Sequence, residues 1–370
     1  MRKSWVKIKL HKQKKKPDIF LAVLTLGLTL FGLLAIYNAS SVLAFRDFAD
    51  KYHFVRDQST WLGLGLLGMV LAVFFDYHRF YKLALPFLFL TLILLLAVFI
   101  PGLGIKALGA RRWLDFRFFS FQPAEFTKLT LVIYLSAWFS LPERGRLWAF
   151  LLLSGIVVGL VAIEPDLGTA IIIVSIAFVL YFASGAPFYH FLFLVPLAGL
   201  GAFIFSLLSP YRFRRLIIFL NPSLDPLGAS YHIRQVLIAI GSGGLTGLGL
   251  GKSRQKYEYL PEAMTDSIFA ITAEELGFIG ASILIIAFIL IIYRGIKIAL
   301  RSPDRFGQLL SLGITSSLAI QVIINLSAMV ALLPLTGVPL PFISYGGSSL
   351  VVNLIGIGIL LNVSKQGMAG

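Results

Sequence analysis

The chain is dominated by apolar segments, each about as long as a helix that crosses a membrane. Ten such segments are visible, and each has the roughly 17 to 25 residues that span the hydrocarbon core of a bilayer. They cover about residues 19–43, 58–75, 83–105, 124–141, 147–163, 167–184, 188–208, 268–292, 308–332 and 346–363. A helix satisfies its backbone hydrogen bonds within the segment, as lipid requires. The pattern therefore predicts an all-α polytopic membrane protein with about ten transmembrane helices.

Basic residues predict how these helices are oriented. Eight Lys and Arg lie in the first 16 residues, and four more lie in the loop 293–307. Such clusters remain on the cytoplasmic side, so ten spans place both termini in the cytoplasm. We expect a basic cytoplasmic tail at 1–17 that contacts anionic membrane lipid, and one integral membrane domain at 18–370. Lipid contact accounts for the net charge of +15 without a nucleic-acid partner.

One extramembrane segment is long, at about residues 209–267, and this topology makes it extracytoplasmic. Pro222, Pro226 and the glycine-rich run at 241–251 favour a folded, re-entrant loop over a further membrane span. The run is similar to a nucleotide-binding P-loop, but Thr246 stands where that motif requires glycine. Its glycines are expected instead to permit tight turns and close approach of the backbone to a ligand.

The residue types present exclude several chemistries. The chain has no cysteine, which rules out disulfides, thiol nucleophiles and thiolate metal sites. Its five histidines never fall at the spacings that are typical of a zinc site. Carboxylates and cations remain as the candidates for chemistry.

Five carboxylates gather where the long loop enters an apolar stretch. They are Glu258, Glu262, Asp266, Glu274 and Glu275. Charged groups are costly to keep at the edge of a bilayer, so the cluster indicates a functional site. Asp266 also stands where the next helix begins, and an aspartate there can simply cap that helix. The sequence leaves both roles open.

Cations on the outer side form a second group. Lys106, Arg111, Arg112 and Arg117 lie in one short outer loop, where the positive-inside rule does not favour them. We interpret them as ligands for an anionic group, because arginine donors match phosphate oxygens.

Three polar residues lie within the apolar segments or at their ends. Glu125 and Lys128 are three residues apart and share one helical face. Either they neutralise each other as an ion pair, or they line an outward-facing polar cavity. Asn325 is interpreted only as a hydrogen bond between helices.

Two further segments are expected near the same cavity. Asp166, in the short turn EPDLG, is predicted to cap the helix that follows it. The segment 333–349 is rich in proline and glycine and contains Ser344. Such residues are tolerated at membrane depth where the backbone lines a cavity, so we expect this segment to form a wall.

Five parts of the chain, taken in order, form a pattern known from one bacterial family. They are GARRWLDF with FQPAEFTK (109–128), EPDLGTA (164–170), DPLGASYHIRQ with IAIGSGGLTGLGLG (225–251), QKYEYLPEAMTDSIFA with EELGFIG (255–280), and LPLTGVPLPFISYGGSS (333–349). The chain thereby resembles the SEDS family (shape, elongation, division and sporulation) over most of its length. The run at 255–262 and the ending SYGGSS are more similar to the division members than to the elongation members.

The resemblance has three departures near the expected site. Ser267 replaces the usual phenylalanine, Ser230 replaces a glycine, and Arg234 replaces a serine. The family's essential aspartate is retained as Asp266, so the departures concern the pocket around it.

The resemblance implies a peptidoglycan glycosyltransferase of the bacterial cytoplasmic membrane that polymerises lipid II. It implies a class B penicillin-binding protein, a transpeptidase, as partner, together with other division or elongation membrane proteins. Asp266 is the implied catalytic residue. Substrate-binding residues are expected at Arg111, Arg112, Trp113, Gln122, Glu125, Lys128, Asp166, Arg215, His232, Gln235, Lys256, Glu262 and Ser344. No metal ligand is assigned. The one cofactor considered is a divalent cation (Mg²⁺ or Mn²⁺), which Glu125 binds unless it instead holds Lys128 in place.

The implied reaction converts an α-linked donor into a β-1,4 product, so it inverts the sugar once. One displacement needs one general base and cations that hold the departing pyrophosphate. It needs no second carboxylate as nucleophile, unlike a retaining glycosidase. Two alternatives remain at this point: a lipid II flippase, which would need gating on both faces, and a non-catalytic scaffold of the cell-wall machinery.

Overall fold

Each of the ten predicted segments contains a helix in the computed structural model, which describes residues 16–107, 110–116, 119–142, 145–207, 210–221, 229–257 and 260–367. The segment predicted at 83–105 is too long, because its helix ends at Ala97 and a short strand begins at Gly104. The corresponding helices are α1 (Ile19–Phe48), α2 (His53–Phe74), α3 (His78–Ala97), α4 (Pro123–Phe139), α5 (Leu147–Ile163), α6 (Leu167–Ala183), α7 (Phe188–Leu207), α10 (Ile268–Leu300), α11 (Arg305–Met329) and α12 (Gly347–Gln366). Seven described helices, α1, α2, α3, α7, α10, α11 and α12, are long and apolar enough to cross a membrane. Helices α4, α5 and α6 have 17 residues each, and the ten-span count stays a prediction.

Several predictions concern residues outside these ranges. They include most of the basic tail at 1–17, the turn at 222–228, and the side chains of Arg117 and Glu258.

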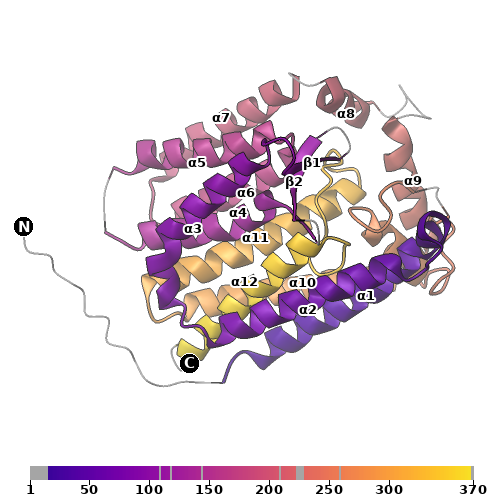
Figure 1. Cartoon of the computed structure of the whole chain (residues 1–370), viewed down its shortest axis with the longest axis horizontal. Helices are drawn as coiled ribbons and strands as arrows, with labels where there is room; N and C mark the ends of the chain where they lie inside the picture. Colours follow the sequence, from indigo (N-terminus) through magenta and orange to yellow (C-terminus); the bar gives the residue numbers. More distant parts are fainter. Residues whose placement is uncertain are drawn as a thin grey trace, which may run out of the picture.

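Two shorter helices fill the long loop between α7 and α10. They are α8 (Pro210–Leu220) and α9 (Ala229–Ser242). In Figure 1 both helices lie at one end of the bundle, where α8 adjoins α7 and α9 packs against α10. The long loop therefore contains two helices, and its re-entrant position in the membrane stays a prediction.

A small sheet interrupts the helical pattern between α3 and α4. Its strands, β1 (Gly104–Ala107), β2 (Ala110–Asp115) and β3 (Ser120–Phe121), are antiparallel in the order β1-β2-β3. The cation-rich loop is thus a folded hairpin with Trp113 opposite Ile105. The all-α prediction missed these strands because they are too short to give a clear alternating pattern.

Helices α4, α11 and α12 form the middle of the bundle, whereas most of α7 faces outward. Helix α12 packs against α2 through glycines that bring the two backbones close together. A Cβ at Gly358 would lie 2.4 Å from the carbonyl oxygen of Met69, and one at Gly347 would lie 2.3 Å from the ring of Trp61. Small residues provide this close contact in membrane bundles, where apolar burial alone gives little driving force.

Helix α10 is broken near its N-terminal end. Gly277 has φ 68° and ψ −167°, values that interrupt the helical hydrogen bonds. The glycine-rich run replaces them: Leu248 N donates to Glu274 O at 3.0 Å, and Phe278 N donates to Gly244 O at 2.9 Å. The predicted role of these glycines in close backbone approach is correct, but the neighbour in the structure is α10.

Candidate functional site

Asp266 lies one residue before the N-cap of α10. The N-cap is Ser267, and it makes no side-chain capping hydrogen bond. The Asp266 carboxylate is 7% exposed and accepts a hydrogen bond from Thr265 Oγ1 at 3.3 Å. Helix capping therefore does not explain this aspartate.

The surroundings of Asp266 disfavour its charged form. Burial raises the pKa of its carboxyl to about 7, and the nearby Glu262 carboxylate contributes to the rise. Arg215 acts in the opposite direction but more weakly. A carboxyl with a pKa near neutrality can both release and accept a proton at physiological pH, which is what general-base chemistry requires.

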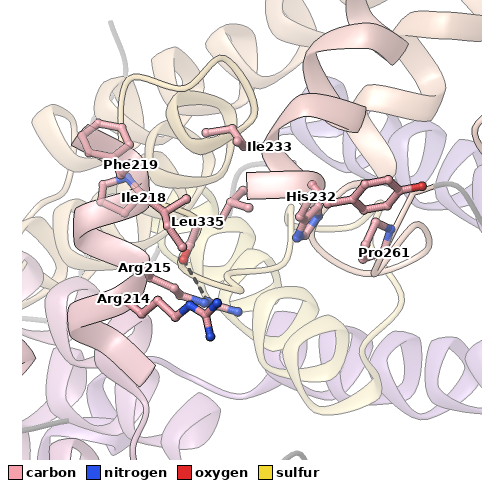
Figure 2. Close-up of a pocket in the computed structure, with 10 residues that line it drawn as sticks. Arg214, Arg215, Ile218, Phe219, His232, Ile233, Pro261 and Leu335 are labelled. Atoms are coloured by element: carbon pink, nitrogen blue, oxygen red, sulfur yellow. Dashed lines mark hydrogen bonds between the residues drawn. The ribbon is translucent and has the colours of Figure 1, made fainter. Parts of the chain in front are cut away.

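A cavity of about 230 Å³ lies between α8, α9, Pro261 and residues 334–335. Asp266 does not line it, but the lining residue His232 contacts Ser267, the next residue in the chain. Figure 2 shows Arg214 and Arg215 on one side of it and His232 with Pro261 on the other. Arg215 donates to the carbonyl oxygen of Leu335 at 3.0 Å. The cavity therefore combines arginines with an apolar lining.

His232 connects the cavity to the start of α10. Its Nε2 lies 2.7 Å from the hydroxyl of Ser267, the residue after Asp266. Burial and the neighbouring Arg215 charge lower the pKa of this imidazole to about 4. His232 is thus neutral at physiological pH and serves here as a hydrogen-bonding group. Gln235, half-buried, follows it one turn along α9.

The segment 334–346 packs directly against the chain that leads to Asp266. Tyr345 N donates to Met264 O at 2.8 Å. Ser344 is buried, and its hydroxyl accepts from Leu340 N at 2.8 Å, so it stabilises the turn rather than facing the cavity. The segment is a wall of the site, as predicted, although its serine points elsewhere.

The cations of the outer hairpin contact backbone carbonyls. Arg112 donates to Glu164 O at 3.3 Å and also to Pro165 O, which ties β2 to the turn between α5 and α6. Arg111 is exposed, with one donor 3.5 Å from Phe99 O, and Trp113 is half-buried. Among these residues, Arg111 is the most open to an anionic ligand.

Asp166 has the predicted capping role at α6. It accepts from Thr169 N at 3.1 Å and from Gln122 Nε2 at 2.9 Å, so the cap also holds the start of α4. Glu164 beside it is fully buried. Burial, reinforced by the Asp166 charge, raises the pKa of Glu164 to about 8.

Glu125 and Lys128 form a buried ion pair. Lys128 Nζ lies 2.8 Å from Glu125 Oε2 and donates to Gln321 Oε1 at 2.8 Å. The two residues are 3% and 2% exposed. Of the two readings left open by the sequence, the structure favours the ion pair. With its carboxylate facing Lys128, Glu125 does not fit a divalent cation, and the described residues hold no cluster of three or more metal-ligating side chains.

Lys256 belongs to another buried cluster. Its ammonium donates to Gly251 O and lies 3.8 Å from Glu275 Oε1. Glu274 beside it accepts from Arg254 N at 3.0 Å and from the Ser253 hydroxyl. These carboxylates hold the chain that follows the glycine-rich run. The resemblance placed Lys256 among the substrate-binding residues, whereas its partner in the structure is Glu275.

The structure thus gathers Arg215, His232 and Glu262 around Asp266, as the sequence predicted. It adds two residues that sequence reasoning did not select, Arg214 and Asn325. Asn325 Nδ2 donates to Asp266 O at 2.9 Å. A polar residue inside an apolar segment was the available signal, but its partner could not be identified from the sequence.

The chain was compared with known proteins. The model of the FtsW/RodA/SpoVE family of cell cycle proteins matches residues 19–368. Stage V sporulation protein E of Bacillus subtilis (strain 168) is 42% identical over 360 residues, 95% of this chain and 98% of the relative. A probable peptidoglycan glycosyltransferase FtsW of Geobacter sp. (strain M18) is 38% identical, covering 94% and 97%. The chain belongs to the FtsW/RodA/SpoVE family.

Solved structures agree with this assignment. A chain described under "Structural coordination of polymerization and crosslinking by a peptidoglycan synthase complex" superposes with a TM-score of 0.76 at 32% identity, covering 94% of this chain and 97% of that one. The rod shape determining protein RodA of Thermus thermophilus gives 0.71 at 31% identity, covering 96% and 98%. The identities to FtsW and sporulation relatives are higher than those to RodA, which agrees with the expected similarity to division members.

Proposed function

We propose that Asp266 is the general base with which this peptidoglycan glycosyltransferase forms each glycosidic bond. The observation that carries the proposal is a buried carboxylate without a capping role and with a pKa near 7, which Ser267 and His232 connect to an arginine-lined cavity. We also propose that lipid II is the substrate.

The proposed reaction is a single displacement. Asp266 accepts the proton of the acceptor sugar's 4-hydroxyl as that oxygen forms a bond to the donor's anomeric carbon. The bond from the anomeric carbon to the pyrophosphate breaks, and the pyrophosphate leaves with its electron pair. One inversion at that carbon gives the β-1,4 linkage.

Cations must stabilise the departing pyrophosphate, and the candidate cations differ in their contacts. Arg214 and Arg215 line the cavity, so we propose them as the phosphate ligands. Lys128 and Lys256 are buried against carboxylates, and Arg112 contacts carbonyls. We infer that these three fix the surrounding backbone.

A crosslinking partner and a location complete the proposal. The solved relative with a TM-score of 0.76 is described by the coordination of polymerisation with crosslinking. We infer that the crosslinking partner of this chain is a class B penicillin-binding protein. We place the protein in the bacterial cytoplasmic membrane with both termini inside. Because the chain has no cysteine, single cysteines can be labelled from outside intact cells. Labelling is expected within 225–250 and not within 293–307, and the reverse result would refute the orientation.

Polymerisation in detergent separates this function from lipid II transport, since detergent leaves no second membrane face. The purified protein with its partner should convert lipid II into glycan polymer, whereas the Asp266→Asn protein should not. Loss of a positioned base removes about 10² to 10⁴ of the rate. A matched variant, Glu262→Gln, removes a neighbouring carboxylate and should retain polymerisation. Full polymerisation by Asp266→Asn would mean that another group is the base.

A further inference from the structure

Two buried carboxamides on α11, Gln321 and Asn325, lie between the Lys128 ion pair and Asp266. They are four residues apart, so they project from one face of the helix. Their exposed fractions are 0% and 1%. Both use their side chains to bond elements other than α11.

Asn325 holds the main chain of the proposed base. Its Nδ2 donates to Asp266 O at 2.9 Å and to Val338 O at 2.8 Å. One amide group therefore fixes the residue before the N-cap of α10 and the wall segment 334–346 at the same time.

Gln321 continues this connection toward α4. Its Nε2 donates to Pro339 O at 2.9 Å, one residue after the carbonyl that Asn325 binds. Its Oε1 accepts from Lys128 Nζ at 2.8 Å. Hydrogen bonds, joined by the peptide link between residues 338 and 339, thus connect Asp266 through Asn325 and Gln321 to the ion pair of Lys128.

We propose that Asn325, braced by Gln321, is a positioning residue that sets the location of the Asp266 carboxylate in the active site. The proposal rests on the proposed role of Asp266 as base. Asn325 bonds the backbone of Asp266 and leaves the carboxylate available to the acceptor hydroxyl. Such a residue acts on the geometry of the reaction, where a displacement of about 1 Å from a remote substitution can cost roughly 100-fold in rate.

Asn362 on α12 provides a matched control. It is also an asparagine, 4% exposed, and its Nδ2 donates to Val73 O at 2.8 Å while its Oδ1 accepts from Tyr77 N at 3.0 Å. It joins α12 to the turn between α2 and α3, and it has no contact with Asp266 or the cavity. Removing it tests what the loss of a buried interhelical amide does by itself.

The experiment compares Asn325→Ala and Asn362→Ala in lipid II polymerisation with the partner in detergent, together with their thermal unfolding. We expect Asn325→Ala to lower kcat by roughly 10- to 100-fold with KM within about two-fold of the parent. Asn362→Ala should lower the unfolding temperature by a similar amount yet retain the parent kcat. Gln321→Leu should also lower kcat, and unchanged turnover in that variant would overturn the part of the proposal that concerns Gln321.

Other outcomes are equally decisive. Unchanged kcat in Asn325→Ala, or an equal loss in Asn362→Ala, would overturn the proposal. Asn325→Asp, which keeps the side-chain size, serves if the alanine variant does not accumulate. If neither Asn325 variant accumulates whereas Asn362→Ala does, Asn325 is only a stabilising residue and the proposal is wrong. Asp266→Asn is measured in parallel, because an active Asp266→Asn protein would refute the proposed base and not the bond network.

Discussion

Replacing Asp266 with asparagine should remove polymerisation and, above neutral pH, make the protein more stable. The aspartate carboxyl ionises near pH 3.8 in the unfolded chain, whereas burial holds the proton on folded Asp266 until about pH 7. Between these values the folded state binds more protons than the unfolded state, so stability falls as the pH rises. Above pH 7 the whole penalty is present.

The size of the effect follows from the two pKa values. They differ by about three pH units, and each unit corresponds to roughly 1.4 kcal/mol, so the buried charge costs on the order of 4 kcal/mol above pH 7. Asparagine has nearly the same shape and no charge, and no capping bond is lost because Ser267 is the N-cap. The variant should therefore be more stable by up to this amount at pH 8 and by about 1 kcal/mol at pH 4.5.

Thermal unfolding of the detergent-solubilised parent and variant at pH 4.5 and pH 8 measures the difference. The same two proteins at pH 4.5 are the internal control, since folded Asp266 is then protonated and only the unfolded carboxyl is charged. A variant that is less stable than the parent at pH 8, or a difference that does not change with pH, would show that the Asp266 charge is well solvated. The environment described for the base would then be wrong.

Three further predictions follow from neighbouring contacts. Polymerisation should rise with pH through about 7 as Asp266 ionises. Glu262→Gln should move the midpoint of this pH–rate profile to lower pH, because it removes a like charge beside Asp266. An unmoved pH–rate profile would exclude Glu262 from the site. Lys128→Ala should destabilise the protein by roughly 3 to 5 kcal/mol because it leaves the Glu125 charge buried alone, and the double variant Glu125→Gln/Lys128→Met should recover accumulation in membranes. Gly277→Ala should prevent folding, since its Cβ would lie 2.3 Å from the nitrogen of Gly247. The control variant Gly159→Ala should accumulate normally, because a Cβ at Gly159 has open space. Equal accumulation of the two variants would refute the broken helix.

Parts of the site could be predicted because they depend on local sequence. Asp166 caps α6 as expected, since an N-cap is decided by the residue and the helix that follows it. The pair Glu125 and Lys128 lies on one face because helical spacing requires it. Whether that pair faces solvent or the bundle interior depends on α11, which supplies Gln321 as a partner of Lys128. Gln321 is nearly 200 residues away in the chain, so the local sequence could not predict this contact.

The apolar segments by themselves determined that the chain forms membrane helices, because lipid permits few other backbone structures. The motifs by themselves indicated the family and selected Asp266. Only the tertiary structure decided the surroundings of each cation: it placed Lys128 and Lys256 against buried carboxylates, and Arg214 and Arg215 in the lining of the cavity. It also gave Asn325 its partners. These outcomes depend on where helices distant in sequence pack, and the free energy of burying a charge is set by those neighbours rather than by the residue itself.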